Sequence, residues 1–371
     1  MKYYIIAGEA SGDLHASNLI AELKKKDKNA EIRAWGGDLM KSQGATLVKH
    51  YRHMAFMGFV EVVANLHRVL GNIRECKADM LRYQPDVVIL VDYPGFNLRI
   101  AEFAHRKGMK VCYYISPQVW AWKRHRVKKI KKCVDKMLVI LPFEEPFYKE
   151  YGVNATFVGH PLLDELSKLK TPSRLHFIHR NDLSEKKEII ALLPGSRKQE
   201  VERMLGTMLK LIPHFPQYQF VVAGVPSLDK ALYLRMIGNT DARLVENQTY
   251  ELLQNASAAL VTSGTATLET ALLSVPEVVC YKANHLSYLI AKRLIRVKYI
   301  CLVNLVMDKE VVKELIQNDF NEDNLVKELE SLLNDPKRQR RILDDLDMLK
   351  HALGNSGASE QAAEVILNMV K

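Results

Sequence analysis

The chain has 371 residues, of which 48% are hydrophobic and 26% charged, a composition that indicates a soluble globular protein and excludes a disordered or fibrous one. At roughly 150 residues per domain, this length favours two domains. The 53 Lys and Arg residues exceed the 43 Asp and Glu residues, and the formal net charge of +10 favours an anionic partner: nucleic acid, a phosphorylated small molecule or an anionic membrane surface.

Membrane, disulfide and metal signals are weak. No apolar run approaches the roughly 18 residues that span a bilayer, and Glu9 precedes any signal-peptide core, so we expect a cytoplasmic protein. The five cysteines form no CxxC pair and are predicted to be reduced thiols. His176 and His179 lack an acidic neighbour at ligand spacing, so no metal site is expected.

The first half of the chain alternates apolar runs with segments of helical period. Continuous apolar runs such as Val87-Val88-Ile89-Leu90-Val91 are typical of parallel strands covered on both faces, which predicts a doubly wound α/β domain. Strands are expected at 2–7, 31–35, 86–91, 110–115, 136–141 and 156–158, and helices at 11–26, 61–83, 98–107, 119–132 and 143–151.

The second half repeats the alternation after a polar, Lys-rich stretch at 163–187 that we interpret as a linker. Its strands are expected at 188–193, 219–223, 243–246, 258–262 and 277–281, and nearly everything from 308 onward, including a last helix at 359–370, is expected to be helical. We therefore predict two Rossmann-like domains, 1–165 and 166–350, and a C-terminal helix within 351–371 that could pack back on the first domain. Because each sheet binds ligands at the carboxyl ends of its strands, two such domains favour a ligand cleft between them.

Two loops of the second half have the chemistry of a phosphate site. In LLPGSR (192–197), Gly195 permits close backbone approach, Ser196 opens the next helix and Arg197 could hold a diphosphate bidentately; the alternative is a plain strand-to-helix turn. In SGTATLE (263–269), Ser263, Gly264 and Thr265 lie at a helix start. Glu269, one turn later, could bind ribose hydroxyls. The alternative there is a capping box that needs no ligand.

Acidic residues follow two strands of the first half. Asp92, in VDYPGFN (91–97), is a candidate general base at the tip of a buried strand, and the alternative is an Asx turn before Pro94. The loop AGEASGD (7–13) carries two acids that would repel a diphosphate. We therefore expect it on the acceptor side, with Ser11 binding substrate and with Glu9 and Asp13 binding sugar hydroxyls or assisting Asp92. Alternatively, Asp13 supports only the helix that starts there.

Two stretches are candidate membrane contacts. WAWKRHRVKKIKK (120–132) joins Trp120 and Trp122 to a basic helix that includes Lys128 and Lys129, which suits an anionic membrane surface; nucleic-acid binding and a solvated basic face are the alternatives. The apolar stretch around Phe56, Met57 and Phe59 could touch lipid or belong to the core.

Ten segments together resemble the lipid-A-disaccharide synthase family, glycosyltransferase family 19. They run in order over nearly the whole chain: AGEASGD, GGDLM (36–40), MGFVEV (57–62), VDYPGFN, YISPQVWAWKRHRVKKI (114–130), LPFE (141–144), VGHP (158–161), LLPGSR, SGTATLE and SEQAAEVIL (359–367). The combination is far more specific than any one of these motifs.

The resemblance implies a GT-B enzyme with two facing Rossmann-like domains. It would join UDP-2,3-diacylglucosamine to 2,3-diacylglucosamine 1-phosphate, invert the anomeric centre and release UDP, at the cytoplasmic face of the inner membrane. The family places UDP in the C-terminal domain, on the residues of LLPGSR and SGTATLE and near Asn304, and the acceptor in the N-terminal domain, with Asp92 matching the proposed base. In this chain Val303 replaces a common proline before Asn304. No metal or cofactor is expected.

Two rival functions remain open at this point. One is a UDP-sugar epimerase or another GT-B transferase, because a fold does not determine a function. The other is a nucleic-acid-binding protein that uses the positive charge. The sequence contains no RNP-like, helix-turn-helix or aromatic-interleaved basic motif, so no nucleic-acid partner is expected.

Overall fold

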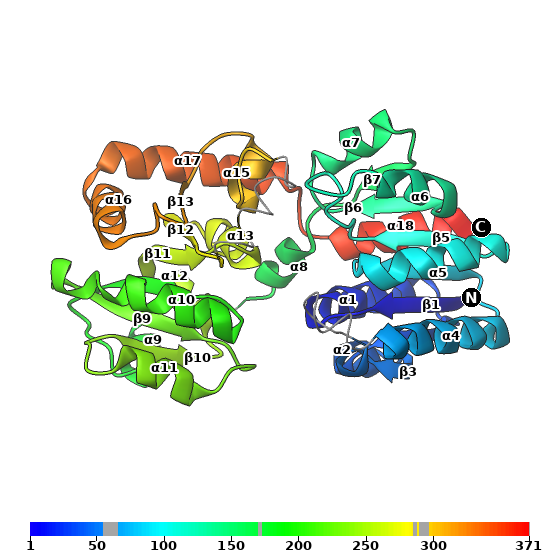
Figure 1. Cartoon of the computed structure of the whole chain (residues 1–371), viewed down its shortest axis with the longest axis horizontal. Coiled ribbons are helices and arrows are strands. Elements are labelled where there is room, and N and C mark those ends of the chain that lie inside the picture. The colour runs from blue at the N-terminus through cyan, green and yellow to red at the C-terminus, as the bar shows by residue number, and fades with distance from the viewer. Residues whose placement is uncertain (55–65, 170–172, 285–287, 289–296, 371) are drawn as a thin grey trace. The chain divides into compact units, whose positions relative to one another are not determined.

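The computed structural model describes residues 1–54, 66–169, 173–284, 288 and 297–370. The chain divides into two compact units, of which the first is Met1–Ser167 with Leu353–Lys371 and the second is Lys168–Ala352 (Figure 1). From the sequence, the boundaries were expected at 165 and 350. The C-terminal segment belongs to the first unit, so the chain leaves that unit once and returns to it.

The first unit contains a parallel sheet in the order β3-β2-β1-β4-β5-β6-β7. The order reverses between β1 and β4, which is the topological switch point of the sheet. Its strands are β1 (Lys2–Ala7), β2 (Glu31–Gly36), β3 (Thr46–His50), β4 (Val87–Val91), β5 (Lys110–Tyr114), β6 (Lys136–Val139) and β7 (Ala155–Phe157). Its helices are α1 (Ala10–Lys26), α2 (Asp38–Ser42), η1 (Tyr51–His53), α4 (Leu66–Tyr83), α5 (Pro94–Arg106), α6 (Arg126–Cys133), α7 (Glu144–Glu150), α8 (Pro161–Ser167) and α18 (Ala358–Val370).

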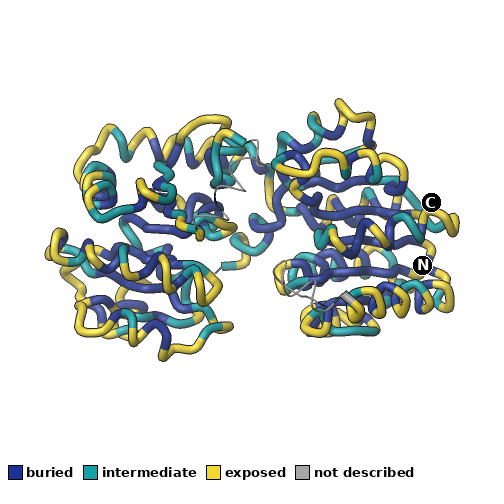
Figure 2. The backbone as a smooth tube through the Cα atoms, viewed as in Figure 1, coloured by how far each residue is buried: buried dark blue, intermediate teal, exposed yellow. Residues whose placement is uncertain are grey.

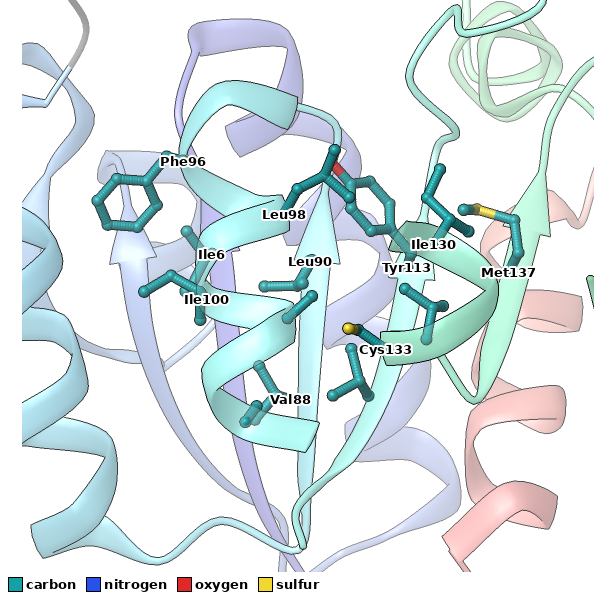
Figure 3. Close-up of a cluster of buried hydrophobic side chains, with 14 of the residues drawn as sticks. Ile6, Val88, Leu90, Phe96, Leu98, Ile100, Tyr113, Ile130, Cys133 and Met137 are labelled. Carbon is teal, nitrogen blue, oxygen red and sulfur yellow. The ribbon is translucent and has the colours of Figure 1, made fainter. Parts of the chain in front are cut away.

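Each face of this sheet has its own hydrophobic layer, because successive residues of a strand point to opposite faces. Tyr4 and Ile6 of β1 join the layer under α4, α5 and α6, which Figure 3 shows with side chains of β1, β4, β5 and β6. Tyr3 and Ile5 join the layer on the other face, formed with α1 and α18. Burial on both faces explains why the strands are continuous apolar runs (Figure 2).

The second unit contains a parallel sheet in the order β10-β9-β8-β11-β12-β13, whose switch point lies between β8 and β11. Its strands are β8 (Glu188–Leu193), β9 (Tyr218–Gly224), β10 (Arg243–Glu246), β11 (Ala256–Thr262), β12 (Glu277–Tyr281) and β13 (Lys313–Ile316). Its helices are α9 (Arg174–Arg180), α10 (Lys198–Leu209), η2 (Ile212–His214), α11 (Lys230–Ile237), α12 (Thr249–Gln254), α13 (Thr265–Leu272), α15 (Leu302–Met307), α16 (Glu322–Asn334) and α17 (Pro336–Ala352).

The structure corrects four expectations about elements. The strands β3 and β13 were not predicted, and β13 interrupts the segment expected to be helical from 308 onward. The supposed linker at 163–187 contains part of α8 and all of α9. The basic helix begins at Arg126 rather than 119, because the chain forms turns between Val119 and His125.

Two further findings concern the cysteines and membrane-spanning helices. All five cysteines are free and buried. Within the described part of the chain, no helix combines the length and the apolar character that crossing a bilayer requires.

Candidate active site

The loops that were predicted to bind substrate or to carry the general base lie at the switch points of the two sheets. In the first unit β1 pairs with β4, so the loops that begin at Gly8 and at Asp92 leave neighbouring strands at the same edge. In the second unit β8 pairs with β11, so LLPGSR and SGTATLE also leave neighbouring strands. Ligands of doubly wound sheets bind at such points, and each unit therefore has one candidate site at its carboxyl edge.

Asp92 lies beside a second acid in the first unit. Burial and, to a smaller extent, the charge of Glu9 raise the pKa of its carboxyl to about 6, against the opposing effect of a hydrogen bond from the Tyr93 amide. Glu9 is the residue before α1 and is partly exposed. The two predicted catalytic residues are thus electrostatically coupled, and a carboxylate with a pKa near neutrality suits a general base.

Gly8 lets the two loops approach each other. A Cβ atom on Gly8 would lie 2.3 Å from the ring of Tyr93, so any larger residue would push this ring away. The Tyr93 hydroxyl donates to the Met54 carbonyl oxygen over 3.0 Å. The glycine of AGEASGD therefore allows packing against VDYPGFN.

Asp13 and Ser11 differ sharply in their surroundings. The Asp13 carboxylate is buried and accepts hydrogen bonds from the amides of Gly37 (2.7 Å), Leu39 (3.1 Å) and Met40 (3.2 Å). These bonds hold the start of α2, so the oxygens of Asp13 are already used inside the unit. Ser11 is exposed on the first turn of α1, so its hydroxyl faces solvent.

In the LLPGSR loop, the amides expected to bind phosphate have an internal partner. The Glu200 carboxylate accepts from the amides of Ser196 (3.0 Å) and Arg197 (3.2 Å), and the Arg197 guanidinium donates to it over 3.2 Å. Gly195 has φ +117°, a conformation that favours glycine, and a Cβ atom there would lie 2.6 Å from that of Glu200. Arg197 is exposed and could exchange its surface ion pair for an anionic ligand at small cost.

The SGTATLE loop presents the start of α13. Gly264 and Thr265 are exposed at that start, and Ser263 donates to the Ile300 carbonyl oxygen over 3.4 Å. The first amides of a helix have no partner within it and carry its positive dipole end. Burial raises the pKa of Glu269, one turn along, and a hydrogen bond from Tyr250 lowers it.

Asn304 is fully buried, and its amide is used internally. Its Nδ2 donates to the Val312 carbonyl oxygen (2.8 Å) and to Glu314 (3.0 Å), and its Oδ1 accepts from the amides of Val311 (2.8 Å) and Val312 (3.0 Å). Asn304 therefore fastens α15 to the segment that enters β13. Any contact with a ligand would have to replace one of these bonds.

The predicted membrane contacts do not share one environment. Trp120 is buried, donates to Glu144 over 3.1 Å and packs edge-on against Phe143, so it is not available to lipid and that prediction is corrected. Trp122 is 42% exposed, and the Lys123 ammonium lies 3.9 Å from its ring centroid.

The remaining predicted contacts lie on α6 or outside the described residues. Lys128 is exposed, and Lys129 is half-buried and forms an ion pair with Glu102 at 2.5 Å. Phe56, Met57 and Phe59 lie outside the residues that the structure describes.

Sequence reasoning missed several residues that hold these loops. Glu200 is the third residue after Arg197, and this capping-box spacing was an available signal. Asn97 and Tyr113 both donate to the Asp92 carbonyl oxygen, and Glu144 holds Trp120. Nothing in the sequence distinguishes Tyr113 from the other apolar residues of β5.

In the ranges 1–54, 66–169, 173–284, 288 and 297–370, no three His, Cys, Asp or Glu side chains are close enough together to share a metal ion.

Comparison with known proteins identifies the family. The family model described as lipid-A-disaccharide synthetase matches residues 3–367. The chain belongs to this family. It is 43% identical to the lipid-A-disaccharide synthase of Syntrophus aciditrophicus, an alignment that covers 99% of this chain and 97% of the relative. The corresponding enzyme of Geobacter metallireducens is 39% identical over 99% of this chain and 96% of the relative.

Solved structures agree on the fold. The UDP-GlcNAc 2-epimerase of Neisseria meningitidis, bound to UDP-GlcNAc, matches with a TM-score of 0.71 at 13% identity and covers 99% of this chain and 100% of its own. The glycotransferase of kitacinnamycin matches with a TM-score of 0.68 at 14% identity, covering 100% of this chain and 99% of its own. The chain thus has the two-domain GT-B fold, and it is a hexosyltransferase of lipid A biosynthesis.

Proposed function

We propose that the enzyme transfers 2,3-diacylglucosamine from its UDP derivative to the 6-hydroxyl of 2,3-diacylglucosamine 1-phosphate. The products are a β-1,6-linked disaccharide 1-phosphate and UDP. The names of the relatives support the product class. The observation that carries the proposal is Asp92, a half-buried carboxylate that interacts with the charge of Glu9 at the switch point of the first sheet and has its pKa raised to about 6.

Asp92 acts as the general base in this proposal. The acceptor oxygen forms a bond to the anomeric carbon while the bond from that carbon to the UDP oxygen breaks, and the hydroxyl proton passes to Asp92. Attack opposite the leaving group inverts the anomeric centre. At pH values above its pKa the carboxylate is ionised and can accept this proton.

The second unit binds the UDP portion in this proposal. Arg197 leaves Glu200 for the diphosphate, and the starts of α10 and α13 place helix dipole ends toward developing negative charge. Glu269 accepts from ribose hydroxyls. Because Glu200 already accepts from two loop amides, the diphosphate relies on Arg197 and α13 more than on those amides.

Reconstitution tests the substrates directly. Purified enzyme is incubated with UDP-2,3-diacylglucosamine and 2,3-diacylglucosamine 1-phosphate, with and without EDTA, and the products are separated. We expect equal disaccharide formation in both samples. Conversion of UDP-GlcNAc without any lipid acceptor would instead identify an epimerase.

Asp92→Asn tests the base. We expect kcat to fall by about 100-fold to 10,000-fold, the usual contribution of a general base, because the amide cannot accept the proton. UDP affinity, measured by calorimetry, should stay unchanged because Asp92 belongs to the other unit. Wild-type turnover would remove Asp92 from the mechanism.

We also propose that the exposed basic surface formed by Trp122, Lys123, Lys128, Lys131 and Lys132 docks on the anionic cytoplasmic face of the inner membrane, where acylated substrates reside. These side chains are exposed, and a tryptophan with surrounding cations suits the headgroup region. Nucleic acid is the competing anionic partner.

Charge reversal tests this surface. Changing Lys128, Lys131 and Lys132 to Glu should weaken binding to phosphatidylglycerol vesicles on the order of 100-fold, because each lysine near such a surface contributes about 1 kcal/mol. Reversal of the exposed Lys337, Arg340 and Arg341 in the second unit is the matched control. Equal binding by both variants would contradict docking through the first surface, and binding to RNA but not to vesicles would favour nucleic acid.

A further inference from the structure

Asp92 is held by its main chain. Its carbonyl oxygen accepts from the Tyr113 hydroxyl over 2.5 Å and from Asn97 Nδ2 over 2.7 Å, and the same Nδ2 donates to the Val91 carbonyl oxygen over 3.1 Å. Both donors are fully buried, one on β5 and one on α5. Two neighbouring elements therefore converge on a single carbonyl group at the end of β4.

The backbone at this point needs such support. Asp92 and Tyr93 have φ values of +43° and +47°, in the left-handed region that residues with side chains rarely occupy. Such conformations persist only where surrounding structure holds them, and they cluster at functional sites. They also end the strand abruptly, because α5 begins with the next residue, Pro94.

The orientation of the Asn97 amide follows from its partners. Turning it over would place Oδ1 against two carbonyl oxygens, which have no proton to donate. In the observed orientation Oδ1 is buried and has no partner among the described residues, while Nδ2 donates to both carbonyl oxygens. Tyr113 lies beneath α5, with its hydroxyl toward the first turn of the helix (Figure 3).

The carboxylate of Asp92 has fewer hydrogen-bond donors around it than the carbonyl oxygen has. Within the described residues no side chain donates a hydrogen bond to it, and the only donor is the Tyr93 amide. A side-chain donor there would stabilise the ionised form and make it a weaker base. The contacts thus fix where the carboxylate lies without occupying it.

We infer that Asn97 and Tyr113 are positioning residues for the base: they hold Asp92 by its carbonyl oxygen and leave its carboxylate free for the acceptor proton. This inference rests on the proposed role of Asp92. Neither residue touches the substrate in it, and both act only through the backbone of Asp92.

Tyr113→Phe tests the inference with the loss of one oxygen atom. We expect kcat to fall on the order of 10-fold to 100-fold, the scale of a misplaced catalytic group, with KM and UDP affinity unchanged. Tyr114→Phe is the matched control, because Tyr114 is the next residue of β5, equally buried, and faces the opposite layer of the core. It should keep wild-type kcat.

A double-mutant cycle separates positioning from a general structural effect. In the Asp92→Asn background, Tyr113→Phe should lower the residual rate no further, because there is no base left to position. Wild-type kcat in Tyr113→Phe, or the same loss repeated in the Asp92→Asn background, would overturn the inference. If Asp92→Asn itself kept full turnover, the failure would lie in the proposed base.

Asn97→Asp provides a second test of the same geometry. It replaces the donor with an acceptor facing two carbonyl oxygens, at almost unchanged volume, and should reduce kcat more than Tyr113→Phe does. The unfolding temperature shows whether the variant is folded. A folded Asn97→Asp enzyme with wild-type kcat would also overturn the inference.

Discussion

Glu9 and Asp92 are two carboxyl groups whose charges interact at the edge of one sheet. Burial is the main reason that the Asp92 pKa rises to about 6, and Glu9 is the next. The base must be ionised, so kcat/KM should fall as the pH drops through this value. Glu9→Gln removes the neighbouring charge, which lowers the Asp92 pKa and moves the acidic limb of the kcat/KM profile to lower pH.

A matched control for this shift is Glu31→Gln. Glu31 is an exposed acid of the same unit at the opposite end of a strand, so its loss changes the net charge equally without changing the field at Asp92. The two pH profiles are compared with that of the wild type. An acidic limb that stays in place in Glu9→Gln would show that this glutamate does not set the pKa of the base.

At the scale of elements, the sequence predicts the central strands of both sheets but only two of the four edge strands, β7 and β10. Central strands such as β4 and β8 are buried on both faces and read as uninterrupted apolar runs. The two edge strands that are missed, β3 (TLVKH) and β13 (KELI), are short, half-buried and interrupted by charges, so no period of two is visible.

Some features of the candidate site could likewise be predicted from the sequence, and others could not. Loops at switch points could be found because each follows a recognisable strand. The contacts of Asp13, Trp120 and Asn304 could not, because their partners lie elsewhere in the chain and are brought close only by folding. A polar or aromatic residue in a chemically suggestive motif can therefore serve the loop itself rather than a ligand.

Trp120 and Trp122 belong to one motif, but Trp120 is buried and binds Glu144 whereas Trp122 is exposed. Burial raises the pKa of Glu144 to about 7, against its ordinary 4.5, and the bond from Trp120 lowers it. Because the folded state favours the neutral acid, this group costs stability as the pH rises from 4.5 toward 7, and loss of the Trp120 donor increases that cost. Trp120→Phe should therefore destabilise the protein by about 1 kcal/mol at pH 5 and by more at pH 8.

Urea unfolding at the two pH values measures this difference. Loss of ring volume affects both values equally, so only the pH dependence reports on Glu144. Trp122→Phe is the control: that tryptophan is largely exposed, and its substitution should change stability by less than about 0.5 kcal/mol at either pH. An equal effect of Trp120→Phe at pH 5 and pH 8 would argue against the proposed coupling.

At the scale of the whole molecule, the first unit is completed by the last helix of the chain. Ala362, Ala363 and Ile366 of α18 belong to the same buried layer as Leu19 and Leu23 of α1. The chain returns from the second unit to supply this layer. The first unit therefore depends on a segment far away in the sequence: Asp164 of α8 and Ser359 of α18, which are hydrogen-bonded, are 195 residues apart. A truncation before α18 would expose the apolar face of α1.

Asp164 of α8 holds the start of α18, and two surface pairs hold its flank. The buried Asp164 carboxylate accepts from the amides of Gly357 (2.5 Å), Ala358 (3.2 Å) and Ser359 (3.0 Å), whereas Lys26 pairs with the exposed Glu360 and Glu364. Asp164→Ala should cost about 2 kcal/mol, the upper range for loss of a helix cap, because it leaves buried amides without acceptors. Lys26→Ala should cost less than about 1 kcal/mol, since water replaces an exposed ion pair. Hydrogen exchange of residues 358–370 should accelerate in the first variant and change little in the second, and the reverse ranking would show that surface charge rather than capping holds the returning helix.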